Sequence, residues 1–439
     1  MGLALRFLSA WVGLGLISLA GSAGAQTTVP VLPDAAYPTV SPSLTILPEA
    51  ATVPALRLRP VSVDPYEPIG IRRGGMIFYP ALEVGALASS NATQTPSQAK
   101  SGVGLRLRPS LRFESDWVRH SWEGRASGDI TEFLEKGISS DASVDAESRF
   151  RLDIRHNTQA EFTGGYHLSQ TGSANSEVPD TAIGKRIDHN ISAGIGVLHE
   201  FGPLEARMRL GIARQIYEDV DLQGGGKEDN GDRTYTAPSA GLRLTYIDPP
   251  ALKPFAEIVY EPRLHDRKLD RNGLARDSHG LKGAIGVVLE RGPIWSGEAA
   301  IVYAMRDYRD NSLATTSAVG INGNLTWRPT ELTSLLLTLD TTLNESSSAT
   351  VSGSKTYSAN LDVAHALRDN IDIVGGVGLS ATQYPQDTED TYTTKLELEW
   401  QLRPELAWTA GYDGTWFKGI AASDDYNEQR LSIGMVLQR

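Results

Sequence analysis

The feature that most constrains this chain is a strict alternation of apolar and charged residues. In SVDAESRFRLDIR (Ser143 to Arg155), Val144, Phe150 and Ile154 share one phase, and the other phase is charged at nearly every position. Successive side chains point to opposite faces only when the backbone is extended. The stretch therefore predicts a strand with one apolar and one charged face. Taken alone, such a strand fits the surface of a soluble sheet as well as a membrane wall.

The same alternation recurs from Met76 to the last residue. It is plain in VGLRLRPSLRFES (Val103 to Ser115), LEARMRLGI (Leu204 to Ile212) and TKLELEWQL (Thr394 to Leu402). Each segment is near the length of about ten residues with which a tilted strand crosses a bilayer. The repeat predicts an all-β fold, a transmembrane antiparallel outer-membrane β-barrel of about eighteen strands, with about sixteen as the alternative.

Connections between these segments alternate in length. Turn-forming Pro, Gly, Asn and Asp residues mark short connections. The short turns are predicted at Asp116-Trp117, His156-Asn157, Gly202-Pro203, Asp248-Pro249-Pro250, Gly292-Pro293, Arg328-Pro329, Arg368-Asp369-Asn370 and Arg403-Pro404. The long polar loops are predicted at 89–102, 172–185, 219–233, 266–279, 344–353 and 418–425. Short periplasmic turns and long external loops are typical of outer-membrane barrels, and an even strand number predicts that both termini are periplasmic.

The N-terminus carries an export signal. MGLALRFLSAWVGLGLISLAGSAGAQ has one basic residue, a short apolar run and small residues before a cleavage site expected after Ala25, so residues 1–25 are predicted to be a signal peptide. The apolar run is too short to be a stable membrane span. Residues 26–75 are predicted to be a proline-rich periplasmic linker, and residues 76–439 the barrel. The predicted location is the outer membrane of a Gram-negative bacterium, with its lipid as partner.

Composition narrows the classes of function. The chain has 41 Lys and Arg against 53 Asp and Glu, which argues against nucleic acid as a partner. Its 8 histidines are scattered without metal-ligand spacing, so neither a metal nor a cofactor is predicted. His167 and Ser169 share a predicted face but have no third orienting group. No catalytic residue is predicted, and an outer-membrane hydrolase is only a remote alternative.

Charged residues of the inward phase are the candidate site. Their mixed signs predict ion-pair ladders between neighbouring strands and, equally, a wet conduit with hydrogen-bonding walls. The predicted lumen-lining residues are Arg106, Arg108, Arg112, Glu123, Arg125, Asp145, Glu147, Arg149, Arg151, Asp153, Arg155, Glu161, Arg207, Arg209, Arg243, Glu257, Arg263, Lys282, Glu298, Arg306, Lys395, Glu397 and Glu399.

Aromatic residues gather at the two ends of the predicted strands, where amphipathic rings meet lipid headgroups. The predicted girdle at the short turns consists of Trp117, Trp122, Trp295, Trp327, Trp400 and Trp408. The predicted belt near the long loops consists of Tyr166, Tyr217, Tyr235, Tyr260, Tyr303, Tyr384, Tyr392 and Tyr426.

Several stretches carry a family resemblance. YEPIGIRRGGMIFYPALEVG (Tyr66 to Gly85), LKPFAEIVYEPRLHD, GNLTWRPTELTSLLLTLDTTLNE and the closing LSIGMVLQR resemble the putative beta-barrel porin family two, outer-membrane proteins of alphaproteobacteria often linked to exopolysaccharide export. The resemblance implies a channel that supports exopolysaccharide export, with polysaccharide and periplasmic export machinery as partners. A general or sugar-selective diffusion porin is the alternative. The final Leu437-Gln438-Arg439 departs from the aromatic ending usual for such barrels.

Overall fold

The computed structural model describes residue 66 and residues 68–96, 99–346 and 351–439. The predicted signal peptide and most of the predicted linker lie outside the described residues. In this described part of the chain, no helix is long and apolar enough to cross a membrane.

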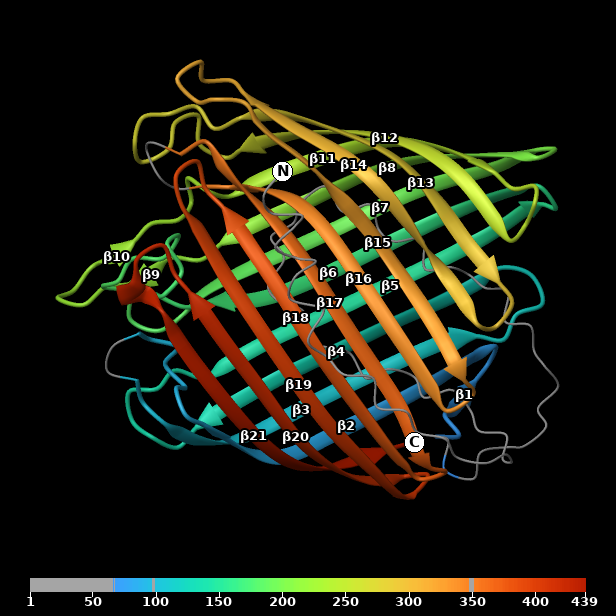
Figure 1. Ribbon diagram of the computed structural model, residues 1–439, viewed down its shortest axis with the longest axis horizontal. Helices are drawn as coiled ribbons and strands as arrows, with labels where there is room; N and C mark the ends of the chain where they lie inside the picture. The colour runs from blue at the N-terminus through green and yellow to red at the C-terminus, as the bar shows by residue number, and fades with distance from the viewer. Residues whose placement is uncertain (1–65, 67, 97–98, 347–350) are drawn as a thin grey trace.

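Eighteen long strands form one closed antiparallel barrel (Figure 1). Each strand pairs with the next long strand in the sequence, and β2 pairs with β21 to close the wall. This confirms the predicted all-β barrel and its strand number. The long strands are β2 (Met76–Ser89), β3 (Gly102–Ser115), β4 (Ser121–Phe133), β5 (Asp141–Arg155), β6 (Thr158–Thr171), β7 (Arg186–Phe201), β8 (Leu204–Tyr217), β11 (Tyr235–Tyr246), β12 (Leu252–His265), β13 (Ser278–Arg291), β14 (Trp295–Tyr308), β15 (Thr316–Thr330), β16 (Thr333–Glu345), β17 (Gly353–Arg368), β18 (Ile371–Gln383), β19 (Thr388–Arg403), β20 (Leu406–Lys418) and β21 (Tyr426–Gln438).

Four short elements complete the described chain. β1 (Ile71–Arg73) forms a tight hairpin with β2. β9 (Val220–Asp221) and β10 (Lys227–Glu228) form a small ribbon in the connection between β8 and β11. A single turn of 3-10 helix, η1 (Ala422–Asp424), lies between β20 and β21.

The connections differ at the two ends of the barrel, which we call the short-turn end and the long-loop end. The long-loop end, with β9 and β10, lies at the left of Figure 1. The turn predicted at Arg328-Pro329 is wrong, because β15 continues to Thr330. The register shifts between Trp327 and Thr330, and such a bulge lets Pro329 remain in a strand although it has no N–H to donate.

Two prolines inside the wall lie at one gap in a ladder. Pairing between β11 and β12 passes from Thr236–Leu264 directly to Ala240–Tyr260, and Pro238 and Pro262 lie within that gap. Proline has no N–H to donate to a ladder. Because Pro238 and Pro262 lie in the same gap, the β11–β12 ladder is interrupted once and not twice.

The two faces of the wall have opposite chemistry. Outward-facing Ile285 and Ile301 are 75% and 66% exposed, whereas inward-facing Arg243 and Arg306 are 1% and 0% exposed. A soluble protein would bury the isoleucines and expose the arginines. An apolar exterior around a charged interior is the arrangement that a bilayer requires of a barrel.

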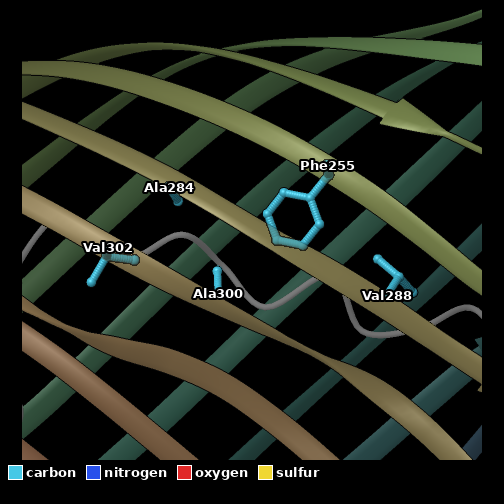
Figure 2. Packing of buried hydrophobic residues seen from close by; sticks show 5 residues of the cluster. All are labelled: Phe255, Ala284, Val288, Ala300 and Val302. Carbon is cyan, nitrogen blue, oxygen red and sulfur yellow. The ribbon is translucent and has the colours of Figure 1, made fainter.

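One part of the inner face is apolar. Figure 2 shows Phe255 of β12 with Ala284 and Val288 of β13 and Ala300 and Val302 of β14, a buried cluster on three neighbouring strands. The small side chains leave room for the Phe255 ring. The guanidinium of Arg243 lies 3.6 Å from the centre of that ring, so the cluster also supports a buried charge.

Candidate functional site: the lumen and its constriction

Charged side chains on the inner face are joined into networks. Arg106 pairs with Asp129 on the neighbouring strand. Arg108 Nη1 lies 3.1 Å from Glu83 Oε2 and 3.7 Å from Glu397 Oε2. Glu397 belongs to β19, which lies four strands from β3 around the barrel. Arg108 therefore braces parts of the wall that do not touch through their backbones.

A second network supports the wall from β8 to β14. Arg209 pairs with Glu257 across the intervening β11. Arg243 Nη2 lies 2.7 Å from Glu298 Oε2, and Arg243 Nη1 lies 3.7 Å from Glu257 Oε2. Since Arg243, Glu257 and Glu298 are almost fully buried, each of these charges depends on its partner, and loss of one partner would leave an uncompensated buried charge.

The remaining predicted lumen residues are mostly paired as well. Lys395 Nζ lies 2.9 Å from Asp362 Oδ1. Other pairs, all within 4.0 Å, are Arg112–Glu114, Arg125–Glu147, Arg149–Glu123, Arg149–Glu161, Arg151–Asp153, Arg207–Glu205, Arg263–Glu345 and Arg306–Glu261. Glu399 faces Asp372 across β18 and β19, and Arg155 is exposed at the short-turn end. Lys282 is buried near Asp340, Glu257 and Glu261.

A cavity inside the barrel lies along the middle of β5, β6, β7 and β8 and reaches β11 and β12. Its lining includes Asp145, Glu147, Arg149, Arg151, Glu161, Arg207, Arg209 and Glu257. Because most of these charges are compensated within the lining, the cavity is polar without a strong field of one sign.

The connection between β6 and β7, residues 172–185, does not project outward as predicted. It crosses the mouth of the barrel, and we call it the crossing loop. The Ser176 N–H donates to Glu389 Oε1 at 3.2 Å, and its hydroxyl donates to the Tyr384 hydroxyl at 3.0 Å. Glu389 and Tyr384 belong to the wall at β18 and β19, nearly opposite β6 in the strand order. Burial raises the pKa of Tyr384, so this hydroxyl keeps its proton.

Glu177 fixes the crossing loop in place. Its carboxylate accepts from Arg233 Nη2 at 3.0 Å and from the Ser346 hydroxyl at 2.8 Å. Its carbonyl oxygen accepts from Arg186 Nη1 at 2.8 Å. The guanidinium groups of Arg186 and Arg233 both lie over the Tyr217 ring, at 4.9 and 4.8 Å. Glu177 thus joins three parts of the mouth through charge-assisted hydrogen bonds.

The base of the crossing loop is apolar. Val178 and Ala182 pack against Val220 of the neighbouring loop, and all three are buried. Apolar residues at Ala174, Val178, Ala182 and Ile183 within this loop were the sequence signal that the connection is covered. The residues that form the constriction, Ser176 and Glu177, were missed by the sequence analysis.

A second cavity lies under the crossing loop, between the wall at β6 to β8 and the wall at β16 to β20. Hydroxyl and amide side chains from both walls dominate its lining, beside the aromatic rings of Tyr384 and Phe417. These polar residues are Ser169, Thr171, Asn175, Asn190, Gln215, Thr342, Asn344, Ser354, Thr356, Ser358, Ser380, Thr382 and Thr391. Of the charged members of the lining, Arg186 pairs with Asp188 and Arg233 with Glu177, whereas Asp340 and Glu389 accept hydrogen bonds from the neutral groups of Asn322 and Ser176. The cavity therefore offers many neutral hydrogen-bonding groups.

No catalytic or metal constellation is found among the described residues. His167 Nδ1 lies 2.6 Å from Asp145 Oδ1, so this histidine is engaged by a carboxylate on β5. Within the described residues, His167 makes no hydrogen bond to Ser169. No group of three or more metal-ligating side chains occurs there either.

The outer loops lock together above the wall. Arg271 pairs with Glu228, and its Nη2 lies 2.9 Å from Asp232 Oδ1. Burial alone would raise the pKa of Asp232, but hydrogen bonds from the side chain and backbone of Arg271 hold that pKa below its ordinary value. The loop between β8 and β11 and the loop between β12 and β13 are therefore joined to each other at the long-loop end.

Aromatic residues mark both ends of the outer surface. Trp122, Trp295, Trp327, Trp400 and Trp408 lie at the short-turn end, each between 36% and 46% exposed. Near the long-loop end, Tyr260, Tyr303 and Tyr392 are exposed on the outer face. The predicted belt positions of Tyr217 and Tyr235 are wrong, because both rings are buried inside the barrel against arginines.

An apolar outer band, aromatic rims and a polar interior define an outer-membrane β-barrel of the porin type. Its sequence agrees with this class over nearly the whole length: the chain belongs to the family described as "Putative beta-barrel porin 2", whose profile matches residues 64–439. The protein is therefore placed in the outer membrane.

Solved structures give distant matches. The outer membrane protein opdK from Pseudomonas aeruginosa is 11% identical, with 82% of this chain and 99% of that chain covered and a TM-score of 0.41. The siderophore receptor PirA from Pseudomonas aeruginosa is 9% identical, with 84% and 81% covered and a TM-score of 0.37. No curated protein matches the sequence.

Proposed function

We propose that this barrel is a carbohydrate channel that supports export of an exopolysaccharide across the outer membrane. The observation that carries the proposal is the cavity under the crossing loop, with its lining of hydroxyl and amide side chains. Sugars present hydroxyl groups in all directions, and neutral donors and acceptors can exchange with water along such a surface at little cost.

Two further features support a sugar over an ion as the solute. Both arginines of the lining, Arg186 and Arg233, are paired with carboxylates, so neither offers an open site for an anion. Tyr384 and Phe417 border the same cavity, and the ring of Tyr384 can contact a sugar there. The family resemblance supplies the exopolysaccharide as the solute. It also motivates the proposals that both termini are periplasmic and that the proline-rich segment from Gln26 to Pro68 faces periplasmic export machinery.

A sugar-selective diffusion porin is the second candidate. The crossing loop favours it, since hydrogen bonds of Ser176 and Glu177 hold the loop across the mouth, an arrangement better suited to small solutes than to a long polymer. In both candidates the same cavity residues contact a carbohydrate. The candidates differ in the direction of transport and in the length of the carbohydrate.

Deletion of the gene separates the two candidates. For the export channel, we expect surface polysaccharide to fall and polymer to accumulate in the periplasm. Unchanged surface polymer, together with uptake of small sugars that depends on the protein, would favour the diffusion porin.

Sugar contact is tested with the purified barrel in planar bilayers. Added oligosaccharide should block the ion current, and Thr391→Val should weaken the block because it removes a hydroxyl from the cavity. Thr394→Val is the matched control, since it lies on the opposite face of the same strand. Equal block in both variants, or no block by any oligosaccharide, would contradict a carbohydrate channel.

A further inference from the structure

The wall contains a seam between β15 and β16. Their ladder ends at the pair Gly323 and Leu339, although both strands continue toward the long-loop end. On either side of the seam the pairing is complete: β14 stays bonded to β15 as far as Thr316, and β16 to β17 as far as Glu345. The β16–β17 hairpin therefore parts from β15 but stays joined to the rest of the wall.

Beyond the seam, β16 passes along the inner side of β15. By alternation Thr341 and Leu343 should face lipid, but they are only 2% and 4% exposed, whereas Val319 on β15 is 63% exposed. Leu343 packs in one cluster with Ala304 and Ala318, which are buried on β14 and β15. The wall overlaps itself here, and the overlap narrows the lumen.

Specific contacts hold the hairpin inward. Arg263 Nη1 donates to Glu345 Oε1 at 2.5 Å, and Arg263 Nη2 donates to the carbonyl oxygen of Leu343 at 3.2 Å. The Ser346 hydroxyl donates to Glu177, so the hairpin and the crossing loop support each other. The side chain of Asn322 replaces one of the missing β15–β16 backbone hydrogen bonds, since the Thr341 N–H donates to Asn322 Oδ1 at 3.0 Å.

The sequence is equally compatible with a closed seam. If the register continued beyond Gly323 and Leu339, Leu343 would face Val319 on the lipid side, and Thr342 and Asn344 would face the lumen. Such a ladder would satisfy backbone groups that hydrocarbon cannot. Backbone pairing therefore favours one position of the hairpin, and the Arg263 contacts favour the other.

We propose that the β16–β17 hairpin is a two-position gate. In the inward position, which the structure adopts, it narrows the lumen beneath the crossing loop. In the paired position, β16 continues its ladder with β15, Thr341 and Leu343 turn to the lipid, and the lumen widens. The proposal does not depend on which solute passes, because it follows from the register and the burial of β16.

Engineered disulfides can trap each position, since the chain has no cysteine of its own. Ala304→Cys with Leu343→Cys joins residues that pack together only in the inward position. Val319→Cys with Leu343→Cys joins residues that are opposite only in the paired position. Ile301→Cys with Ile321→Cys is the control, because these residues are partners in the intact β14–β15 ladder.

Both diagnostic pairs should crosslink in isolated outer membranes. In planar bilayers, oxidation of the inward pair should hold the conductance low, oxidation of the Val319 pair should raise it several-fold, and a reductant should reverse both effects. The control pair should crosslink without changing conductance. Complete crosslinking of the inward and control pairs with none of the Val319 pair would overturn the gate, as would equal conductance in both trapped forms.

A single substitution gives an independent test. A Cβ added at Gly320 would lie 2.0 Å from Thr341 Oγ1 in the inward position, whereas in the paired ladder it would point into the lumen. Gly320→Ala should therefore populate the paired position and raise the conductance of the unmodified barrel several-fold. Gly283→Ala is the control, since no atom lies within 4 Å of its added Cβ. Heat-modifiable migration verifies that both variants are folded, and unchanged conductance in folded Gly320→Ala would contradict the gate.

Discussion

Arginine substitutions on the two faces of β7 would test the assignment of its lipid and lumen sides. The centre of this strand lies between Ala193 and Gly194. With the strand centre at the bilayer midplane, Ile195 and Ser192 are equally far from the midplane, on opposite sides of it. Ile195 is 43% exposed on the outer face, whereas Ser192 lines the inner cavity. The pair therefore differs in face and hardly in depth.

The expected cost follows from the geometry of the strand. A rise of about 3.3 Å per residue and a tilt of about 40° give about 2.5 Å of depth per residue, so both positions lie about 4 Å from the midplane. Arginine facing lipid at the midplane costs about 2–4 kcal/mol and less toward the interfaces, which gives about 2–3 kcal/mol for Ile195→Arg. Ser192→Arg reaches water in the cavity and should cost about 0.5 kcal/mol or less.

The assay is reversible denaturant unfolding of the barrel in lipid vesicles, followed by tryptophan fluorescence. Ile195→Ser serves as control for the loss of apolar contact without added charge. Equal destabilisation by the two arginines would show that β7 does not separate lipid from water, and a larger cost at Ser192 would show that its faces are reversed.

Three further outcomes are expected. Glu177→Gln should raise single-channel conductance, because it weakens the attachment of the crossing loop to Arg233; Asp180→Asn, an exposed change in the same loop, should leave conductance unchanged. The lowered pKa of Asp232 means that its pairing with Arg271 stabilises the outer loops above about pH 4 and is lost as the pH falls further; protease cleavage of residues 266–277 should increase below that pH, and Asp232→Asn should show the increase already at pH 7. Phe255→Ala should lower the free energy of unfolding by about 3–5 kcal/mol in the vesicle assay, with Phe255→Leu clearly milder; equal effects would argue against the packed cluster.

Much of the wall could be predicted because the alternation of side chains is a local property. In β5 every second residue from Asp145 to Arg155 is charged, and the pattern alone sets the strand and its two faces. The same rule is insufficient in β16. There the phase predicts that Leu343 faces lipid, but contacts with β12, β14 and β15 draw it inside. Tertiary contacts that oppose the alternation of side chains cannot be recognised from the alternation itself.

The constriction could not be predicted for a different reason. Ser176 binds Glu389, and Glu177 binds Arg233 and Ser346. These partners are far apart in the sequence, and nothing in their spacing indicates that a closed wall will bring them together. A long polar connection in a barrel is expected to lie outside. The exception depends on the size of the mouth, which only the assembled barrel defines.

The closure between β2 and β21 has a consequence for how the molecule is made. All other wall ladders join strands that follow each other along the chain, so hairpins can form from nearby residues. The last ladder pairs Ala81 with Gln438 and waits for both ends of the chain. Until that contact forms, two long edges remain unpaired, and such edges invite aggregation. The barrel must therefore be shielded during its biogenesis, and the joining of its first and last strands is the step at which that protection can end.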